Sequence, residues 1–178
     1  MTPTQVTLQA GQTQTIRVIG TDSEGNGLAN LPGIRFTSGN TAIVEILRVA
    51  LRAPVIEAEV VALSAGSTTV TVSLTFQGIA RTARAAITVS GTLGSSADVT
   101  ATESYAFNPP TVVVARTGTV QWTFDAETHN VTFFAGPTGA PASIPDRANA
   151  QESRTFSAAG HFVYACTIHD MLGTVIVR

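Results

Sequence analysis

Apolar and polar residues alternate in many short stretches along this chain, and turn-forming residues separate the stretches. In one stretch Val120, Trp122 and Phe124 alternate with polar residues, and residues 162–166 show the same spacing. Side chains of a β-strand point alternately to its two faces, so such residues are expected to share a core-facing side. No stretch has the periodicity of an amphipathic helix. The pattern predicts an all-β chain.

The first half of the chain holds seven such stretches. Residues 22–27 form one of the turns between them by composition. Short strands at this spacing are typical of a β-sandwich. This half contains no His or Cys, so no metal chemistry is expected in it. The expected strands are residues 6–8, 15–19, 34–37, 43–46, 55–63, 69–76 and 83–89.

A short segment of glycine and small polar residues divides the chain. We expect residues 92–96 to form a flexible linker, because such residues constrain the backbone little. The linker separates a first β-sandwich domain, residues 1–91, from a second, residues 97–178. Residues 135–150 are rich in Gly, Pro and Ala and predict a long loop. The strands expected in the second half are residues 112–114, 119–124, 162–166 and 173–177.

Composition narrows the classes of function. Charged residues make up 12% of the chain, the net charge is −2, and all ten basic residues are arginine. There is no basic stripe, so neither nucleic acid nor an anionic membrane is an expected partner. Hydrophobic residues reach 44%, but no apolar run is long enough to span a bilayer. Residues 1–10 lack the charged and apolar regions of a signal peptide.

The rare metal-binding residue types fall into one pattern near the end of the chain. Cys166 is the single cysteine, His169 follows three positions later, and Met171 two positions beyond that. His129 lies upstream at the expected start of a strand. A thiolate, two imidazoles and a thioether are the donor set of a blue-copper site. The third histidine, His161, has the opposite parity from Cys166 and is expected to face solvent.

Each of these residues also has an ordinary explanation. A lone cysteine is usually a small buried hydrophobe, a methionine at a strand start usually belongs to the core, and a loop histidine is usually a surface residue. Zinc is the main rival metal, although structural zinc sites take four strong donors. Asn130 is expected to hydrogen-bond to the loop after Cys166, with an ordinary edge or turn residue as the alternative. Asp125 and Glu127 are expected to form a solvated turn.

Residues 97–178 resemble the cupredoxins, the plastocyanin and azurin family of copper proteins. The resemblance implies a Greek-key β-sandwich with one type 1 copper ion, cycling between Cu(I) and Cu(II). It makes His129, Cys166 and His169 the equatorial ligands and Met171 the axial candidate. The matching segments are residues 107–109, 118–122, 129–131, 159–164, 166–169 and 173–175.

One departure from the family pattern concerns the axial ligand. Only Asp170 stands between His169 and Met171, whereas the tightest loop familiar in the family has two residues there. Three arrangements stay open: Met171 at an altered distance, an empty axial side, or an oxygen donor. That oxygen would come from Asp170, a backbone carbonyl or water.

Residues 3–90 resemble the bacterial immunoglobulin-like group 2 domains of surface proteins. The resemblance rests on residues 37–44 and 61–72. Such domains usually act as spacers or adhesive stalks, so we expect an immunoglobulin-like sandwich with no chemistry of its own.

These expectations combine into a copper-binding electron-transfer protein that is not an enzyme. Its expected partner is a redox protein that binds transiently, and its expected location is the periplasm or the cell exterior. Copper-based catalysis would need an open substrate position and usually more than one copper ion. The alternatives are a copper storage or delivery protein, and a structural or adhesive surface protein with an atypical copper site.

Overall fold

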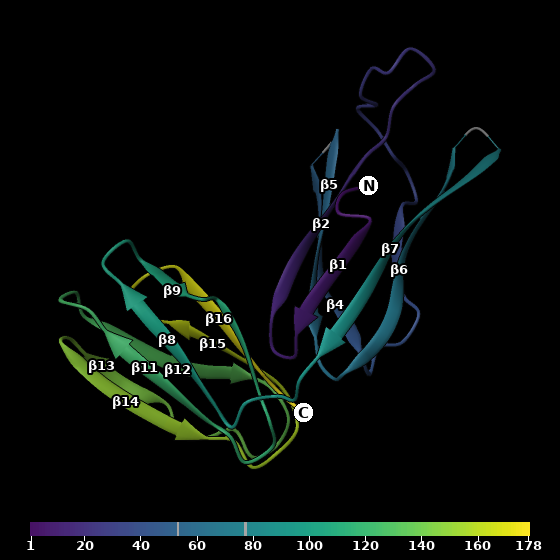
Figure 1. The fold of residues 1–178 in the computed structure, drawn as a ribbon. Helices are drawn as coiled ribbons and strands as arrows, with labels where there is room; N and C mark the ends of the chain where they lie inside the picture. Colours follow the sequence, from purple (N-terminus) through teal and green to yellow (C-terminus); the bar gives the residue numbers. More distant parts are fainter. Residues whose placement is uncertain (53, 77) are drawn as a thin grey trace. The chain divides into compact units, whose positions relative to one another are not determined.

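The computed structural model describes residues 1–52, 54–76 and 78–178. These residues form sixteen strands and no helix, which confirms the all-β prediction (Figure 1). Within them no helix has the length and apolar character needed to cross a membrane. The chain divides into two compact units, Met1–Thr92 and Leu93–Arg178. Each unit is a β-sandwich of two sheets.

The first unit contains one strand for each of the seven expected stretches. One sheet has the order β1-β7-β6-β3 and the other the order β2-β5-β4. Their inward side chains, among them Ile16, Val60 and Ile87, are fully buried in one core. The strands are β1 (Gln5–Gln9), β2 (Thr13–Ile19), β3 (Arg35–Ser38), β4 (Val44–Arg52), β5 (Val55–Ala62), β6 (Gly66–Phe76) and β7 (Ile79–Ser90).

The second unit holds the remaining strands. One sheet has the order β10-β16-β15-β12-β13 and the other the order β14-β11-β8-β9. The boundary between the units falls within residues 92–96, and Ser96 already belongs to a strand. The strands are β8 (Ser96–Thr102), β9 (Ala106–Asn108), β10 (Thr111–Val114), β11 (Thr119–Phe124), β12 (His129–Ala135), β13 (Ile144–Arg147), β14 (Ala150–Thr155), β15 (Gly160–Cys166) and β16 (Met171–Val177).

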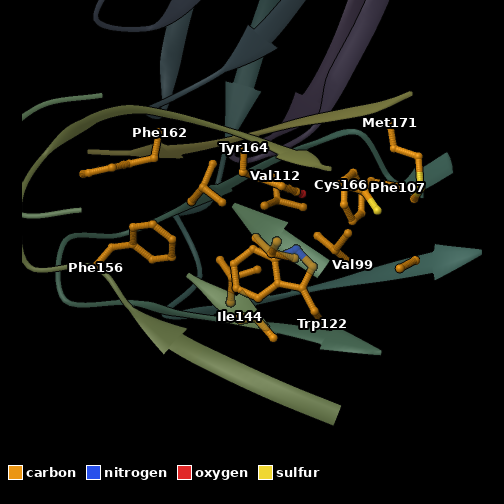
Figure 2. Close-up of a cluster of buried hydrophobic side chains, with 14 of the residues drawn as sticks. Val99, Phe107, Val112, Trp122, Ile144, Phe156, Phe162, Tyr164, Cys166 and Met171 are labelled. Carbon is orange, nitrogen blue, oxygen red and sulfur yellow. The ribbon is translucent and has the colours of Figure 1, made fainter. Parts of the chain in front are cut away.

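The core of the second unit lies between its sheets. Val120, Trp122 and Phe124 are buried, as their alternation predicted. The Trp122 ring meets the Tyr164 ring edge-on at 5.5 Å between centroids. Figure 2 shows Phe156 at one end of the cluster and Cys166 at the other, so the core continues directly into the region of the expected metal ligands.

The expectation of a long loop over residues 135–150 was wrong in part, because β13 forms within it. β13 pairs with β12, where His129 lies opposite Arg147 and Val131 opposite Ile144. Ile144 is the one buried residue among the four of β13, so the sequence of this strand does not alternate between apolar and polar residues. Such a strand can form without an apolar pattern, because hydrogen bonds to a neighbouring strand satisfy its backbone N–H and C=O groups.

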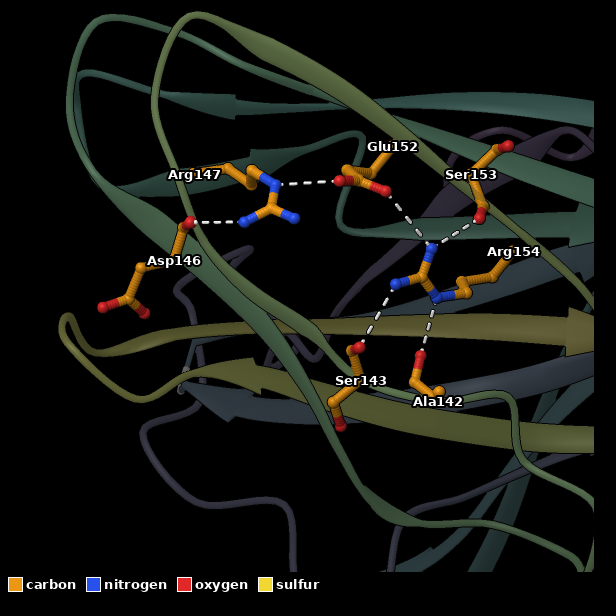
Figure 3. Close-up of polar contacts among 7 residues, drawn as sticks. All are labelled: Ala142, Ser143, Asp146, Arg147, Glu152, Ser153 and Arg154. Atoms are coloured by element: carbon orange, nitrogen blue, oxygen red, sulfur yellow. Dashed lines mark hydrogen bonds and ion pairs between the residues drawn. The ribbon is translucent and has the colours of Figure 1, made fainter.

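β14 was also not expected, and it is bound to the preceding loop by ionic and polar contacts (Figure 3). Glu152 pairs with Arg147 at 2.8 Å and with Arg154 at 3.4 Å. Arg154 also donates to the carbonyls of Ala142 and Ser143 at 2.7 and 3.2 Å. These contacts fasten the segment that carries β13 to the sheet on the other side of the sandwich.

Candidate metal centre

Three of the expected ligands come together at one end of the second unit. His129 is the first residue of β12, Cys166 is the last residue of β15, and His169 lies on the turn between β15 and β16. Because β12 and β15 are antiparallel neighbours, the start of one lies beside the end of the other. The topology therefore brings together residues that are far apart in the sequence.

The distances between the three donor atoms suit a single metal ion. Cys166 Sγ lies 3.9 Å from His129 Nδ1 and 3.8 Å from His169 Nδ1, and the two Nδ1 atoms are 3.1 Å apart. A triangle with these edges has a point about 2.1 Å from every corner. Zinc-sized ions bind His nitrogen at about 2.0–2.1 Å and Cys sulfur at about 2.3 Å. The donor set and its spacing thus fit a trigonal metal site.

The surroundings of His129 favour its neutral form. Burial lowers the pKa of His129, and the neighbouring His169 lowers it further. The backbone of Thr102 and the carboxylates of Glu127 and Asp125 oppose this. Nε2 of His129 is buried and has no hydrogen-bond partner among the described residues. Neutral imidazole is the form that binds a metal ion.

Asn130 joins the start of β12 to the turn after Cys166, which confirms the hydrogen bond expected between Asn130 and this loop. Its Oδ1 accepts the N–H of Thr167 at 2.9 Å, and its Nδ2 donates to Thr167 Oγ1 at 2.8 Å. Nδ2 also donates to Asp146 Oδ1 at 2.9 Å. The buried amide therefore uses both donor hydrogens and its acceptor, which fixes its orientation.

Met171 begins β16 directly opposite Cys166 in the strand register. It is buried, and Figure 2 places it at the same end of the core as Cys166. The short loop before it is closed by a hydrogen bond from Met171 N to His169 O at 2.8 Å. Met171 also lines a groove of about 470 Å³ together with Tyr105 and Leu172. The three converging donors are not among the residues that line this groove.

Tyr105 is the residue of the site that the sequence reasoning missed. Its ring stacks on the His169 ring with 4.4 Å between centroids and 29° between planes. It also meets the His129 ring edge-on at 6.3 Å. Tyr105 lies in the polar turn between β8 and β9. An aromatic residue in such a turn is the sequence feature that could have indicated a role for Tyr105 in the site.

His161 stands outside the centre. It is half-buried, and its Nε2 lies 3.0 Å from Arg178 Nη2. A larger groove, of about 560 Å³, lies in the first unit and includes Val18, Leu31 and Phe76 among its lining residues. That groove contains no His or Cys, so the chemistry of the described residues concentrates in the second unit.

No protein-family model matches the chain, and a search of curated proteins gives no significant match. The chain has distant structural similarity to several solved proteins. A purple cupredoxin from Nitrosopumilus maritimus matches with a TM-score of 0.39 and 21% identity, over 46% of this chain and 99% of its own. A mutant fern plastocyanin matches with a TM-score of 0.41 and 25% identity, over 46% of this chain and 100% of its own. Domains 5–6 of the S-layer protein SbsC match with a TM-score of 0.43 and 17% identity, over 99% of this chain and 94% of their own.

Proposed function

We propose that the second unit binds one copper ion through His129, Cys166 and His169, and that the chain carries single electrons rather than acting as an enzyme. The observation that carries the proposal is the convergence of two imidazoles and one thiol, whose ligand atoms lie within 4.8 Å of one another. When bound, copper supplies a couple between Cu(I) and Cu(II). The soft sulfur of Cys166 and the two imidazoles suit both oxidation states.

The number of strong donors favours copper over zinc. The group of His, Cys, Asp and Glu side chains that converges here contains three members among the described residues. A structural zinc site takes four such donors, whereas a blue-copper site takes three in a plane and a weak axial thioether. We assign the axial place to Met171, which is buried opposite Cys166.

The fold supports a carrier by holding the donors still. His129 and Cys166 belong to paired strands of one sheet, and Asn130 joins those strands next to both residues. Donors held in this way move little when the charge of the site changes. A small rearrangement lowers the barrier to transfer of an electron.

The surface near His169 suits a transient partner. Tyr105, Ile168 and Leu172 are large side chains with 51%, 46% and 61% of their surface exposed. We propose that a redox protein docks here, through the small and weak contact typical of such encounters. We further propose a location in the periplasm or outside the cell, with the first unit as a spacer.

Titration of the full chain with Cu(II), followed by optical and electron paramagnetic resonance spectra, tests the proposal. We expect an intense thiolate-to-copper band and narrow hyperfine splitting. Cys166→Ser should abolish the band, because it removes the sulfur. His161→Ala is the matched control, since His161 lies outside the centre and its loss should leave the band unchanged.

Two results would contradict the proposal. A pale spectrum with wide splitting would indicate a site made of nitrogen and oxygen donors. Rapid loss of copper to a mild chelator during repeated oxidation and reduction would favour storage or delivery of copper instead. An electron carrier should keep its copper through these cycles.

A further inference from the structure

We propose that Tyr105 is a positioning residue for His169, and that its ring sets the orientation of this imidazole in the metal centre. The inference rests on the proposed function of the centre as a copper site. His169 is the donor with the least support from regular structure, because it lies on a turn while His129 and Cys166 belong to strands. It is also less buried than the other two.

The second nitrogen of His169 has no hydrogen-bond partner among the protein groups that the structure describes. In most metal sites the other ring nitrogen donates a hydrogen bond that fixes the ring orientation. In the part of the chain that the structure describes, the polar contacts of the His169 ring are those of Nδ1 with Cys166 and His129. A contact with the face of the ring is another way for the protein to orient it.

The Tyr105 ring provides that contact. The two rings are nearly parallel, at 29°, with 4.4 Å between centroids. Offset stacking at such distances is a favourable arrangement for aromatic pairs. The same Tyr105 ring meets His129 edge-on, so it touches both imidazoles of the centre. Rotation of His169 away from Cys166 would break the stack.

The backbone conformation at Tyr105 is one that a tyrosine seldom adopts, which indicates that the surrounding turn holds the residue in place. Its φ is 57°, in the left-handed region that bulky residues rarely adopt. The turn is held by Tyr105 N donating to Thr102 O at 2.9 Å and by Thr102 Oγ1 donating to Ala106 O at 3.0 Å. Such backbone outliers persist where the surrounding structure enforces them and gather at functional sites.

The exposure of Tyr105 shows that ordinary core packing does not explain its position. Its side chain stays 51% exposed although one face covers His169. The ring therefore covers His169 and is itself half exposed to solvent. The electron-rich face also attracts an imidazole that carries positive charge, so it stabilises the more highly charged Cu(II) state.

Three variants of the full chain separate the contributions of Tyr105. Tyr105→Phe keeps the ring and removes the hydroxyl. Tyr105→Leu removes the aromatic ring but keeps an apolar side chain. Tyr105→Gly removes the side chain and relieves the left-handed backbone, which glycine adopts without strain. If the aromatic ring orients His169, the His169 ring in Tyr105→Phe should have the same environment as in the wild type. Tyr105→Leu and Tyr105→Gly should both lose that environment.

The first measurement uses the metal-free protein, so it does not depend on copper binding. Nuclear magnetic resonance should show ring-current shifts on the His169 ring protons in the wild type and in Tyr105→Phe. These shifts should disappear in Tyr105→Leu and Tyr105→Gly, while the resonances of His161 stay in place. Unchanged His169 resonances in the Leu and Gly variants would overturn the proposal.

The second measurement uses the copper-loaded protein. We expect a higher reduction potential and several-fold faster loss of copper to a chelator in the Leu and Gly variants, with Phe close to the wild type. Identical potentials and loss rates in all four proteins would overturn the role of Tyr105 toward the metal. If the wild type bound no copper, the proposed function would fail while the metal-free measurement still reported on the stack.

Discussion

Asn130 and Thr167 are joined by two hydrogen bonds that run in opposite directions. Thr167 N–H donates to Asn130 Oδ1 at 2.9 Å, and Asn130 Nδ2 donates to Thr167 Oγ1 at 2.8 Å. Asn130 follows His129 directly, and Thr167 follows Cys166 directly. The pair therefore links the two segments of the chain directly after the donors that lie on strands.

Asn130→Ala should loosen the centre and destabilise the fold. The variant loses the hydrogen bonds of Asn130 to Thr167 and Asp146, and a typical intramolecular hydrogen bond contributes about 0.5–1.5 kcal/mol to stability. Loss of a side chain that supports metal ligands should weaken copper binding about 10–100-fold. Denaturant unfolding of the metal-free protein and competition with a chelator measure the two effects.

Asn130→Asp is the comparison for this variant. A carboxylate still accepts the Thr167 N–H, but it has no hydrogen to give to Asp146 and would repel that carboxylate, so it should not restore the stability of the wild type. An Asn130→Ala protein with the copper affinity of the wild type would show that the pair does not support the site.

Met171→Leu tests the axial donor. The exchange conserves volume in a buried position, so the free energy of unfolding should change by less than about 1.5 kcal/mol. Loss of a weak thioether donor should leave the thiolate-to-copper band in place and raise the reduction potential, because the axial ligand tunes that potential. Voltammetry and optical spectra of the two proteins check this. A potential equal to that of the wild type would mean that the thioether does not reach copper.

Glu152 should make the fold more sensitive to acid. Hydrogen bonding from Arg147 lowers the pKa of Glu152, and Arg154 contributes in the same direction. A carboxyl whose pKa is lower in the folded state stabilises the fold above its unfolded pKa, near 4.5, and this contribution is lost as the pH falls through the folded value. The difference in unfolding free energy between wild type and Glu152→Gln should therefore shrink in acid.

Urea unfolding at neutral pH and at a pH below the folded value measures this difference. Glu103→Gln is a control, because Glu103 is exposed and lies outside the described ion pairs. An unchanged difference for Glu152→Gln across this pH range would contradict the prediction.

A fragment of residues 93–178 should bind copper as the full chain does. All three converging donors, Asn130 and Tyr105 lie within the second unit, which has a core of its own. Titration of the fragment beside the full chain, with the same optical readout, checks this. A large loss of affinity in a folded fragment would show that the first unit shapes the centre.

The sequence by itself determined the strands whose side chains alternate and the residue types of the centre. Val120, Trp122 and Phe124 could be assigned to a core because a buried face requires apolar side chains at every second position. Cys166 and His169 are close in the sequence, so their joint role could be proposed from spacing and donor chemistry.

Tertiary structure alone decided which distant residues meet. The strand β13 has little apolar pattern in its sequence, and it forms because its backbone pairs with that of β12. Pairing of β12 with β15 brings His129 beside Cys166, and the turn after β15 places His169 Nδ1 3.1 Å from His129 Nδ1. Tyr105 reaches His169 because the turn between β8 and β9 ends beside the turn after β15. Contacts between turns of different strands leave no periodic trace in the sequence, since they depend on how the sheets pack.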